Sequence, residues 1–321
     1  MNDITPIIFL GAPRNGTTWL GNILNEVFGI PTAVHPLHYG LHESKTCKHY
    51  KKWGKFLDTD TYIEFLEAYG SCDYFQLAKG DKLYFYENPQ QDFLDFYFEL
   101  MDQFAKKLDS TIWCTKLDPD YYIHPKELSI FLEKINERYR AVKFVGIKRK
   151  YNAYFQSYLK MNGRSFKQRQ KLPFLGYWLA AARYETYYLA IDKILANQNG
   201  LHLTFENLNE NYELTIEQIK LFLGTKRLKL KTTAPANTSF HKQNRRKGIS
   251  RLPKIIHKLV ASFPFTAILI LQVYEKLKPT RLNIYRRLLK AKYFRAEFIN
   301  ELKQSNDLIL IDYLNKQDKD F

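Results

Sequence analysis

Short apolar runs alternate with longer amphipathic stretches along most of the chain. An apolar run bounded by turn residues predicts a buried strand, whereas apolar positions three and four residues apart predict a helix. On this basis we expect strands at residues 7–11, 111–117, 141–149 and 201–205. Helices are expected at residues 18–28, from about residue 151, and at residues 215–223. Strands that alternate with helices predict an α/β fold, with a parallel sheet covered by helices on both faces.

Further helical stretches do not fit this alternation, and we interpret them as cover over the sheet or as additions to it. Residues 61–69 and 89–108 are aromatic and helical in pattern, and helices dominate again after residue 252. No Gly/Ser-rich linker separates a second domain. We therefore expect a single domain over residues 1–321, with an insertion at residues 31–109 and C-terminal helices at residues 251–321.

The charge of the chain is concentrated in one region. The 321 residues include 49 Lys and Arg against 33 Asp and Glu, which gives a formal net charge of +16. Residues 225–295 hold 19 Lys or Arg and one acidic residue, leaving 30 basic and 32 acidic residues for the rest of the chain. Such a region favours an anionic partner: nucleic acid, a membrane surface or a phosphorylated small molecule. A solvated helix face would have the same composition.

Composition and patterning exclude several classes of protein. A hydrophobic content of 45% with 16% aromatic residues is too high for a disordered chain. Cys47, Cys72 and Cys114 are odd in number and lack CxxC spacing, so neither a disulfide framework nor a zinc site is indicated. The first ten residues lack a basic leader, and the apolar stretch 263–274 is shorter than the roughly 20 residues of a spanning helix. We expect a cytoplasmic protein, with peripheral membrane contact left open.

The sharpest local motif is GAPRNGTTW at residues 11–19, where the first strand passes into the first helix. Gly11 and Gly16 have the spacing of a Walker A loop, whose backbone N–H groups bind phosphate at a helix N-terminus. Thr17 stands where the Walker lysine would be, and the cation, Arg14, lies inside the loop. The sequence therefore predicts a P-loop-like phosphate site that is not a magnesium triphosphate site.

The segment PRNGTTW, residues 13–19, resembles the P-[KR]-[ST]-G-T-T-W loop of sulfotransferases that use 3′-phosphoadenosine-5′-phosphosulfate (PAPS). A second motif of that family, an Arg at a strand end with a Ser eight positions later, is similar to Arg149 and Ser157. LTFENLNENYELTIEQIKLFLG, residues 203–224, resembles the family's strand, E-[DN]-L turn and helix. Residues 237–250 resemble its late basic loop, which often contains R-K-G and closes over the nucleotide.

This resemblance implies a site for the two anionic groups of PAPS and no metal. The first loop would hold the 5′-phosphosulfate, with Arg14 stabilising charge on the departing phosphate, and the Arg and Ser would hold the 3′-phosphate. Two positions depart from the family: Asn15 replaces a small hydroxyl residue, and Lys150-Tyr151 replaces an Asp-Pro or Asn-Pro. The cofactor-binding residues that the resemblance assigns are Arg14, Asn15, Gly16, Thr17, Thr18, Trp19, Arg149, Ser157, Arg246, Lys247 and Gly248.

An acceptor hydroxyl must lose its proton as it attacks sulfur, so a general base is expected. Sulfotransferases use His or Glu, and HPLHYGLHES, residues 35–44, resembles the segment where the heparan sulfate enzymes carry a catalytic Glu. We rank His38 first as the base, then His35, then Glu43. With His42, this segment holds three histidines in eight residues, so a metal site and neutral loop histidines stay as alternatives.

TKLDPDYY, residues 115–122, is similar to the E-K-[ST]-P-x-Y segment near the reacting groups of the glycan sulfotransferases. Lys116 matches the family's Lys and is the candidate for assisting the leaving group. Thr115 stands at the Glu position, which favours a base among the histidines.

We therefore expect an enzyme that moves the sulfuryl group of PAPS by in-line displacement to a hydroxyl of a glycan, a glycolipid or a phenol. Two other classes stay open: a P-loop small-molecule kinase, and a basic nucleotide-binding or membrane-surface protein without catalysis. The kinase is disfavoured by Thr17 and by the lack of a Walker B carboxylate. Nucleic acid is disfavoured as a partner because no recognition motif accompanies the basic region. The acceptor and the oligomeric state are not fixed by the sequence.

Overall fold

The computed structural model describes residues 3–36, 56, 58–161, 173–225, 251–263, 267–268 and 271. The chain divides into two compact units. The first is formed by Met1–Tyr154 and Thr186–Gly248, and the second by Phe155–Glu185 and Ile249–Phe321. The whole sheet belongs to the first unit.

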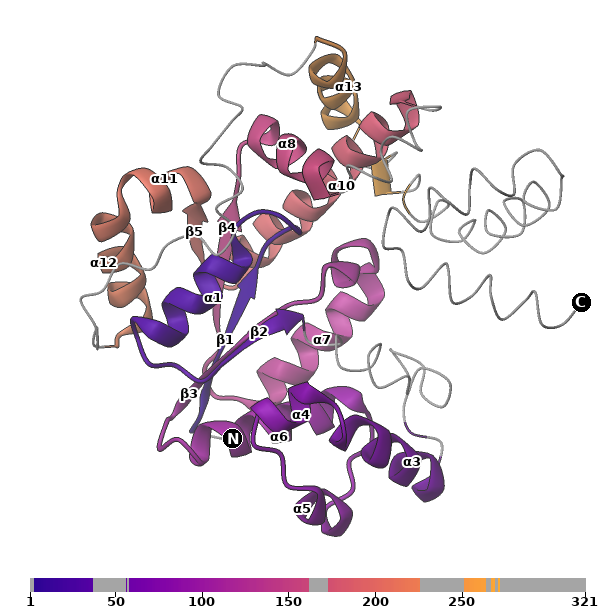
Figure 1. The fold of residues 1–321 in the computed structure, drawn as a ribbon, viewed down its shortest axis with the longest axis vertical. Coiled ribbons are helices and arrows are strands. Elements are labelled where there is room, and N and C mark those ends of the chain that lie inside the picture. Colours follow the sequence, from indigo (N-terminus) through magenta and orange to yellow (C-terminus); the bar gives the residue numbers. More distant parts are fainter. Residues whose placement is uncertain are drawn as a thin grey trace, which may run out of the picture. The chain divides into compact units, whose positions relative to one another are not determined.

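Five parallel strands form one sheet in the order β2-β3-β1-β4-β5 (Figure 1). The strands are β1 Thr5–Leu10, β2 Thr32–Pro36, β3 Ile112–Lys116, β4 Lys143–Lys148 and β5 Leu201–Thr204. The four strands expected from the sequence are confirmed to within two residues at each end, and so is the parallel α/β fold. The edge strand β2 was not expected. Proline at the end of a short run is typical of edge strands rather than central ones.

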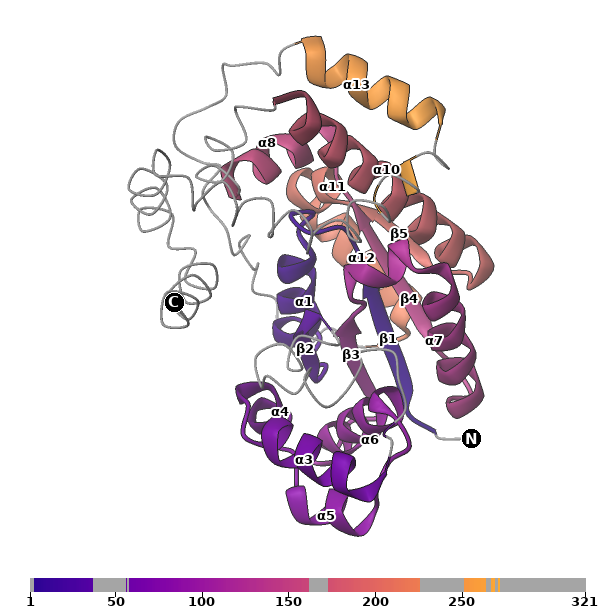
Figure 2. The ribbon, with the colours of Figure 1, turned by 90° about the vertical axis from the view of Figure 1, so that its right-hand side faces the viewer.

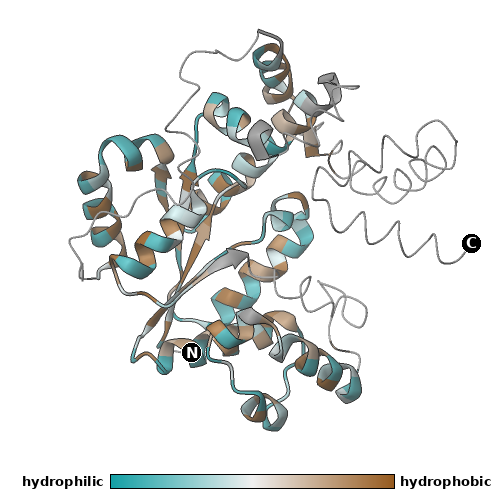
Figure 3. Ribbon diagram, viewed as in Figure 1, coloured by the Kyte–Doolittle hydropathy of each residue, from teal (hydrophilic) through white to brown (hydrophobic). Residues whose placement is uncertain are grey.

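Helices cover both faces of this sheet, as expected, and Figure 2 shows α1 and α7 on opposite sides of it. α1 Thr17–Glu26 and α12 Tyr212–Leu223 bury their apolar sides in one core with Ile7, Phe9 and Val145. On the other face, α6 Phe93–Lys106 and α7 Pro125–Arg138 pack around β3: the Phe98 ring lies 6.3 Å from Trp113 and 6.0 Å from Phe131. The central strands are accordingly largely brown in Figure 3, and several helices show both brown and teal.

The long helix α10, Pro173–Asn197, runs from the second unit into the first. Its C-terminal half packs closely on β4 at Gly146, where a Cβ would lie 2.4 Å from Leu195 Cδ1. With a side chain at this position, Leu195 would have to shift. α10 thereby reaches the strand that precedes Arg149.

Aromatic side chains fill the layer formed by α6 and three shorter helices. These are α3 Thr59–Gly70, α4 Asp73–Leu77 and α5 Lys82–Glu87. Phe96 is central: its ring lies 4.5 Å from Phe85 and 5.0 Å from Phe65. The two aromatic stretches are thus confirmed as helices outside the sheet, and these rings are core. The remaining elements are η2 Pro119–Ile123, α8 Tyr151–Met161, α11 Phe205–Glu210 and α13 Arg251–Ser262.

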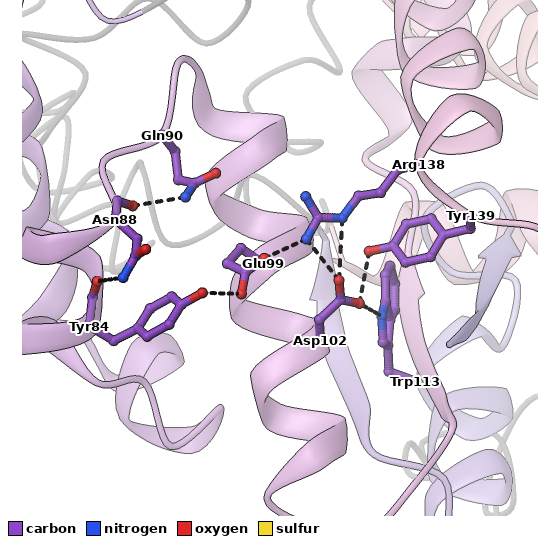
Figure 4. A network of polar contacts seen from close by, with 8 residues as sticks. All are labelled: Tyr84, Asn88, Gln90, Glu99, Asp102, Trp113, Arg138 and Tyr139. Carbon is purple, nitrogen blue, oxygen red and sulfur yellow. Dashed lines mark hydrogen bonds and ion pairs between the residues drawn. The ribbon is translucent and has the colours of Figure 1, made fainter. Parts of the chain in front are cut away.

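A buried polar network ties α6 to β3 and to the end of α7 (Figure 4). The Asp102 carboxylate accepts hydrogen bonds from Trp113 Nε1 at 2.8 Å, Tyr139 Oη at 2.9 Å and Arg138 Nη2 at 2.8 Å. Arg138 also pairs with Glu99 at 2.6 Å, and Glu99 accepts from Tyr84 Oη at 2.8 Å. A buried carboxylate with this many donors fixes the register of three elements.

None of the helices in the described ranges combines the length and the apolar character that a bilayer span requires.

Candidate functional site

The carboxyl ends of the central strands bring several loops together. Neighbouring residues at this edge are Phe9 with Lys116, Leu10 with Gly146, and Lys148 with Thr204. β1 lies between β3 and β4. The connection after β1 leads to β2 on one side of it, and the connection after β3 leads to β4 on the other side. Ligands of open α/β sheets bind at such a point. The residues that follow β1, β3 and β4 are therefore the first place to look for a site.

The loop at residues 11–16 leads from β1 into α1 and requires both of its glycines. Gly16 has φ +90°, and a Cβ there would lie 2.6 Å from Phe205 Cδ2. At Gly11 a Cβ would lie 2.4 Å from Thr17 Cγ2. Gly16 is the N-cap of α1, and no side chain caps the helix. The first N–H groups of α1 consequently have no partner within the helix, and this end is electropositive.

Arg14 and Arg149 meet at this loop. Arg14 has φ 75°, a left-handed conformation that costs free energy for any residue with a Cβ. Its carbonyl accepts a hydrogen bond of 3.0 Å from Arg149 Nη1. Arg149 directly follows β4, is only 6% exposed, and has its guanidinium carbon 4.1 Å from the centre of the Phe205 ring.

The electrostatics around Arg149 suit an anion. Burial lowers the pKa of Arg149; the nearby Glu206 carboxylate raises it, and the positive charge of Arg14 lowers it further. Two guanidinium groups that disfavour each other's charge are stabilised when an anion binds between or beside them. The loop thus combines an uncapped helix end with two mutually repelling cations.

Two tyrosine hydroxyls form hydrogen bonds with residues of this loop. Gly11 N–H donates to Tyr122 Oη at 3.2 Å, and the Tyr122 ring lies 5.5 Å from that of Tyr187 on α10. Asn15 Nδ2 donates to Tyr188 Oη, which also accepts from Arg149 N–H at 3.1 Å. The sequence analysis missed both tyrosines, because these contacts join residues more than a hundred positions apart. Only the position of Tyr122 in the segment DPDYY, after the predicted strand at residues 111–117, hinted at a role.

Asn15 is fully buried at 0% exposure, and its amide is half satisfied. While Nδ2 bonds to Tyr188, Oδ1 has no hydrogen-bond partner among the described residues. Buried amide atoms normally find a partner. The unmatched atom therefore marks a place where a ligand can complete the hydrogen bonding.

Lys116 is the last residue of β3 and lies at the level of Phe9, just before the loop. Burial lowers the pKa of Lys116 to about 8, and the Asp118 carboxylate offsets part of that effect. Asp118 itself caps η2 by accepting from Asp120 N–H at 2.9 Å. Thr115 has another role, since its hydroxyl bonds to Tyr97 Oη at 2.6 Å. At neutral pH the Lys116 ammonium is thus mostly protonated, and a modest change in its surroundings can shift its pKa enough to change its charge.

The other predicted site residues are only partly described. Thr17, Thr18 and Trp19 form the first turn of α1, and Trp19 is buried with its ring 5.6 Å from Phe205. Ser157 is buried on α8 in the second unit. His35 belongs to β2, one residue before the Pro36 that pairs with Lys116, but its side chain is not described. The residues outside the described ranges are His38, His42, Glu43, Arg246, Lys247 and Gly248.

Within the described ranges, no three His, Cys, Asp or Glu side chains lie close enough together to hold a metal ion.

A parallel sheet whose central strand leads through a two-glycine loop into an uncapped helix defines a P-loop-like α/β protein. The sequence matches the sulfotransferase family (Sulfotransfer_3) over residues 6–228, a range that includes Arg14, Lys116 and Arg149. The chain belongs to this family, and its activity is that of a sulfotransferase.

Two solved structures are similar to the chain at low identity. The sulfotransferase domain of the Synechococcus PCC 7002 olefin synthase is 16% identical, with a TM-score of 0.47, over 81% of this chain and 96% of that chain. The sulfotransferase STF9 from Mycobacterium avium is 13% identical, with a TM-score of 0.33, over 82% of this chain and 69% of that chain. A search of the curated proteins gives no match. Family membership therefore rests on the family match and not on these structures.

Proposed function

We propose that the protein transfers the sulfuryl group of PAPS to a hydroxyl of an acceptor, without a metal ion. The observation that carries the proposal is the pairing of Arg14 and Arg149 beside the uncapped N-terminus of α1. PAPS has two separate anionic groups, and this arrangement offers one cation from the loop and another from the end of β4. Both side chains belong to the first unit, so their geometry does not depend on the second.

The 5′-phosphosulfate is assigned to the loop. Arg14, the N–H groups at the start of α1 and the hydroxyls of Thr17 and Thr18 supply its donors. Fixed donors that face developing charge are commonly the largest catalytic contribution. Charge on the bridging oxygen grows as the sulfuryl group departs, so Arg14 would act more on the transition state than on the bound substrate.

The amide of Asn15 supports this assignment. Rotation of the amide by half a turn exchanges Nδ2 and Oδ1, and the two orientations differ only in their hydrogen bonds. In the rotated form, Oδ1 accepts the Tyr188 hydroxyl proton and Nδ2 becomes a free donor. An anion has acceptors only, so it would select the form that presents Nδ2. Asn15 can thus replace the hydroxyl residue of the family as a donor.

The 3′-phosphate is assigned to Arg149 together with Ser157 and the segment Arg246, Lys247 and Gly248. Arg149 is the member of this group whose position in the first unit is described. A guanidinium group can form charge-assisted hydrogen bonds with a phosphate, which are stronger than neutral ones.

One residue of the segment 35–43 is assigned to accept the proton of the acceptor hydroxyl, and Lys116 is assigned to stabilise the charge of the leaving phosphate. The acceptor oxygen forms a bond to sulfur as the bond from sulfur to the phosphate oxygen breaks, and the acceptor proton passes to the base. His38 is the first candidate for the base, followed by His35 and Glu43. Lys116, protonated, would stabilise the negative phosphate that leaves. Its position at the edge, level with the end of β2, fits this division of roles.

The test compares the affinity of the protein for adenosine 3′,5′-bisphosphate and for adenosine 5′-monophosphate by calorimetry. The bisphosphate should bind at least about tenfold more tightly, since a charge-assisted contact contributes roughly 1.5–3 kcal/mol. Arg149→Ala should remove most of this preference. Arg140→Ala, which removes an exposed Arg between α7 and β4, is the matched control and should retain it. Equal affinities in the wild type would refute PAPS as the donor.

Activity is then measured with sulfur-labelled PAPS and three acceptor classes: glycans, glycolipids and phenols. We favour a glycan or glycolipid. Turnover should persist in EDTA, and a requirement for Mg²⁺ with ATP as donor would support a kinase instead.

A second proposal concerns the membrane surface: we infer that α13 touches anionic lipids from the cytoplasmic side. α13 buries Ile256 and Val260 but leaves Ile255 and Leu259 half exposed, beside the exposed Lys254 and Lys258. Apolar side chains flanked by Lys suit an anionic interface.

Sedimentation with vesicles of phosphatidylglycerol and phosphatidylcholine tests this proposal. The double change Ile255→Ser with Leu259→Ser should lower binding about tenfold. The control is Leu214→Ser with Leu221→Ser on α12, where two even more exposed apolar residues lie near Glu213 and Glu217. Equal loss in both variants, or equal binding to neutral vesicles, would contradict it.

A further inference from the structure

Tyr188 bonds to both halves of the proposed nucleotide site. It lies on α10, is 2% exposed, and belongs to the first unit. Its hydroxyl bonds to the side chain of Asn15 in the loop after β1 and accepts the backbone N–H of Arg149 after β4 at 3.1 Å. Asn15 and Arg149 come from separate parts of the sequence, and in the proposed function they bind different parts of the co-substrate.

The chemistry of a phenol suits such a junction. A Tyr hydroxyl accepts two hydrogen bonds and donates one, so it can serve the amide and the backbone N–H together in either amide orientation. The ring is fixed as well: Lys148 Nζ lies 4.7 Å from its centre. Because the ring and the helix hold the hydroxyl, both bonds end at one fixed point.

The bond from Arg149 Nη1 to the Arg14 carbonyl, 3.0 Å long, closes a cycle. The cycle runs from the loop through Tyr188 to the Arg149 backbone, and from the Arg149 side chain back to the loop. A cycle of this kind resists changes in the separation of its parts more than either bond alone. Without the hydroxyl, the buried Arg149 N–H would lose this hydrogen bond, which costs free energy and loosens the turn.

We propose that Tyr188 is a positioning residue that sets the distance between the 5′-phosphosulfate subsite and the 3′-phosphate subsite. This inference rests on the proposed function. A ligand with two anionic groups gains from both only if their separation matches that of the subsites. Tyr188 therefore acts on the advantage of a bisphosphate over a monophosphate, and not on the affinity of either subsite for a single phosphate.

The experiment measures the affinities of wild type and Tyr188→Phe for three nucleotides: adenosine 3′,5′-bisphosphate, the 5′-monophosphate and the 3′-monophosphate. Phe keeps the ring and its contact with Lys148 and removes only the hydroxyl. The bisphosphate should lose about tenfold in affinity, and each monophosphate less than about threefold. Equal losses for all three nucleotides, or no loss for the bisphosphate, would overturn the inference.

Tyr62→Phe is the matched control. It also removes a buried tyrosine hydroxyl, which donates to the Phe85 carbonyl at 2.9 Å, but in the α3–α5 layer. This variant should bind all three nucleotides as the wild type does. An effect equal to that of Tyr188→Phe would mean that general destabilisation explains the loss.

A second variant tests the same junction from the loop side and covers a failure of Tyr188→Phe to fold. Ser at position 15 is too short to reach Tyr188, so Asn15→Ser should reduce the bisphosphate advantage to a similar degree. In the double variant the two losses should not add, because both cut the same link. Additive losses contradict the inference. If the wild type itself shows no bisphosphate advantage, the proposed function falls too. If the wild type shows the advantage and the variants retain it in full, the inference alone falls.

Discussion

Lys116 is the residue at which pH should act most directly on catalysis. Burial lowers the pKa of its ammonium to about 8, so the fraction that can stabilise a leaving phosphate falls as pH rises through that value. The kcat/KM profile, which reports the free enzyme, should therefore decline above about pH 8. The limb in kcat should lie at higher pH, because a bound anion favours the charged form.

Substitutions at Lys116 identify the source of that limb. Lys116→Arg should retain activity and shift the decline beyond pH 10, since the Arg pKa is above about 12. Lys116→Met should lose about a hundredfold in kcat and lack the limb. A decline near pH 8 that survives in Lys116→Met would assign it to another group.

Deprotonation of Lys116 with rising pH should lower catalytic activity but raise the free energy of unfolding. The pKa of Lys116 is lower in the folded state than the ordinary 10.5, so the unfolded state binds more protons between about pH 8 and 10.5. The contribution of Lys116 to the free energy of unfolding therefore increases with pH in the range where catalysis declines.

At the scale of elements, the network around Asp102 should govern stability and leave catalysis alone. Its strand residue, Trp113, lies near the start of β3, whereas Lys116 ends that strand. Asp102→Asn leaves the Arg138 guanidinium with a weaker partner, and removing one member of a buried ion pair costs about 3 kcal/mol or more.

Tyr139→Phe is the milder comparison, because it removes the 2.9 Å bond to Asp102 without removing a charge and should cost about 1 kcal/mol. Denaturant unfolding measures both costs, and turnover per folded molecule should equal that of the wild type. A cost for Asp102→Asn no larger than that for Tyr139→Phe would contradict the ion-pair interpretation.

The sequence predicted those elements whose apolar residues form either one continuous run or one helical stripe. β1, β3 and β4 are continuous apolar runs, and α1 has an apolar stripe, so each was expected within a few residues of its place. α10 was not expected as one long helix. Its buried residues include the consecutive Leu179, Ala180, Ala181 and Ala182, so it lacks the one-sided stripe by which helices are recognised.

The candidate site was predictable only where it lies in a local motif. Arg14 and Gly16 stand in one loop whose pattern indicated them, and Arg149 was indicated by the resemblance of a strand-end Arg followed by a Ser eight positions later. Tyr188 contacts Asn15 across 173 positions, and such a pairing has no local pattern. Lys116 was indicated by resemblance, but its lowered pKa depends on burial that only the fold creates.

At the scale of the whole molecule, nucleotide binding should be visible as stability. Adenosine 3′,5′-bisphosphate at a hundred times its Kd should raise the free energy of unfolding by about 2.7 kcal/mol. Thermal melts at equal concentrations should show a larger rise in Tm for the bisphosphate than for adenosine 5′-monophosphate. Equal rises would contradict the assignment of Arg149 to the 3′-phosphate.

The left-handed backbone of Arg14 determines which substitution at this position should stabilise the protein. A left-handed residue with a Cβ costs about 1–2 kcal/mol, and glycine avoids this while losing about 0.5–1 kcal/mol to its greater freedom in the unfolded chain. Arg14→Gly also removes the repulsion of Arg149 and keeps the carbonyl that Arg149 contacts. Without nucleotide, this variant should melt above the wild type; with saturating bisphosphate it should melt below it. A selection for heat resistance alone would therefore enrich Arg14→Gly and discard the arginine that we assign to the 5′-phosphosulfate.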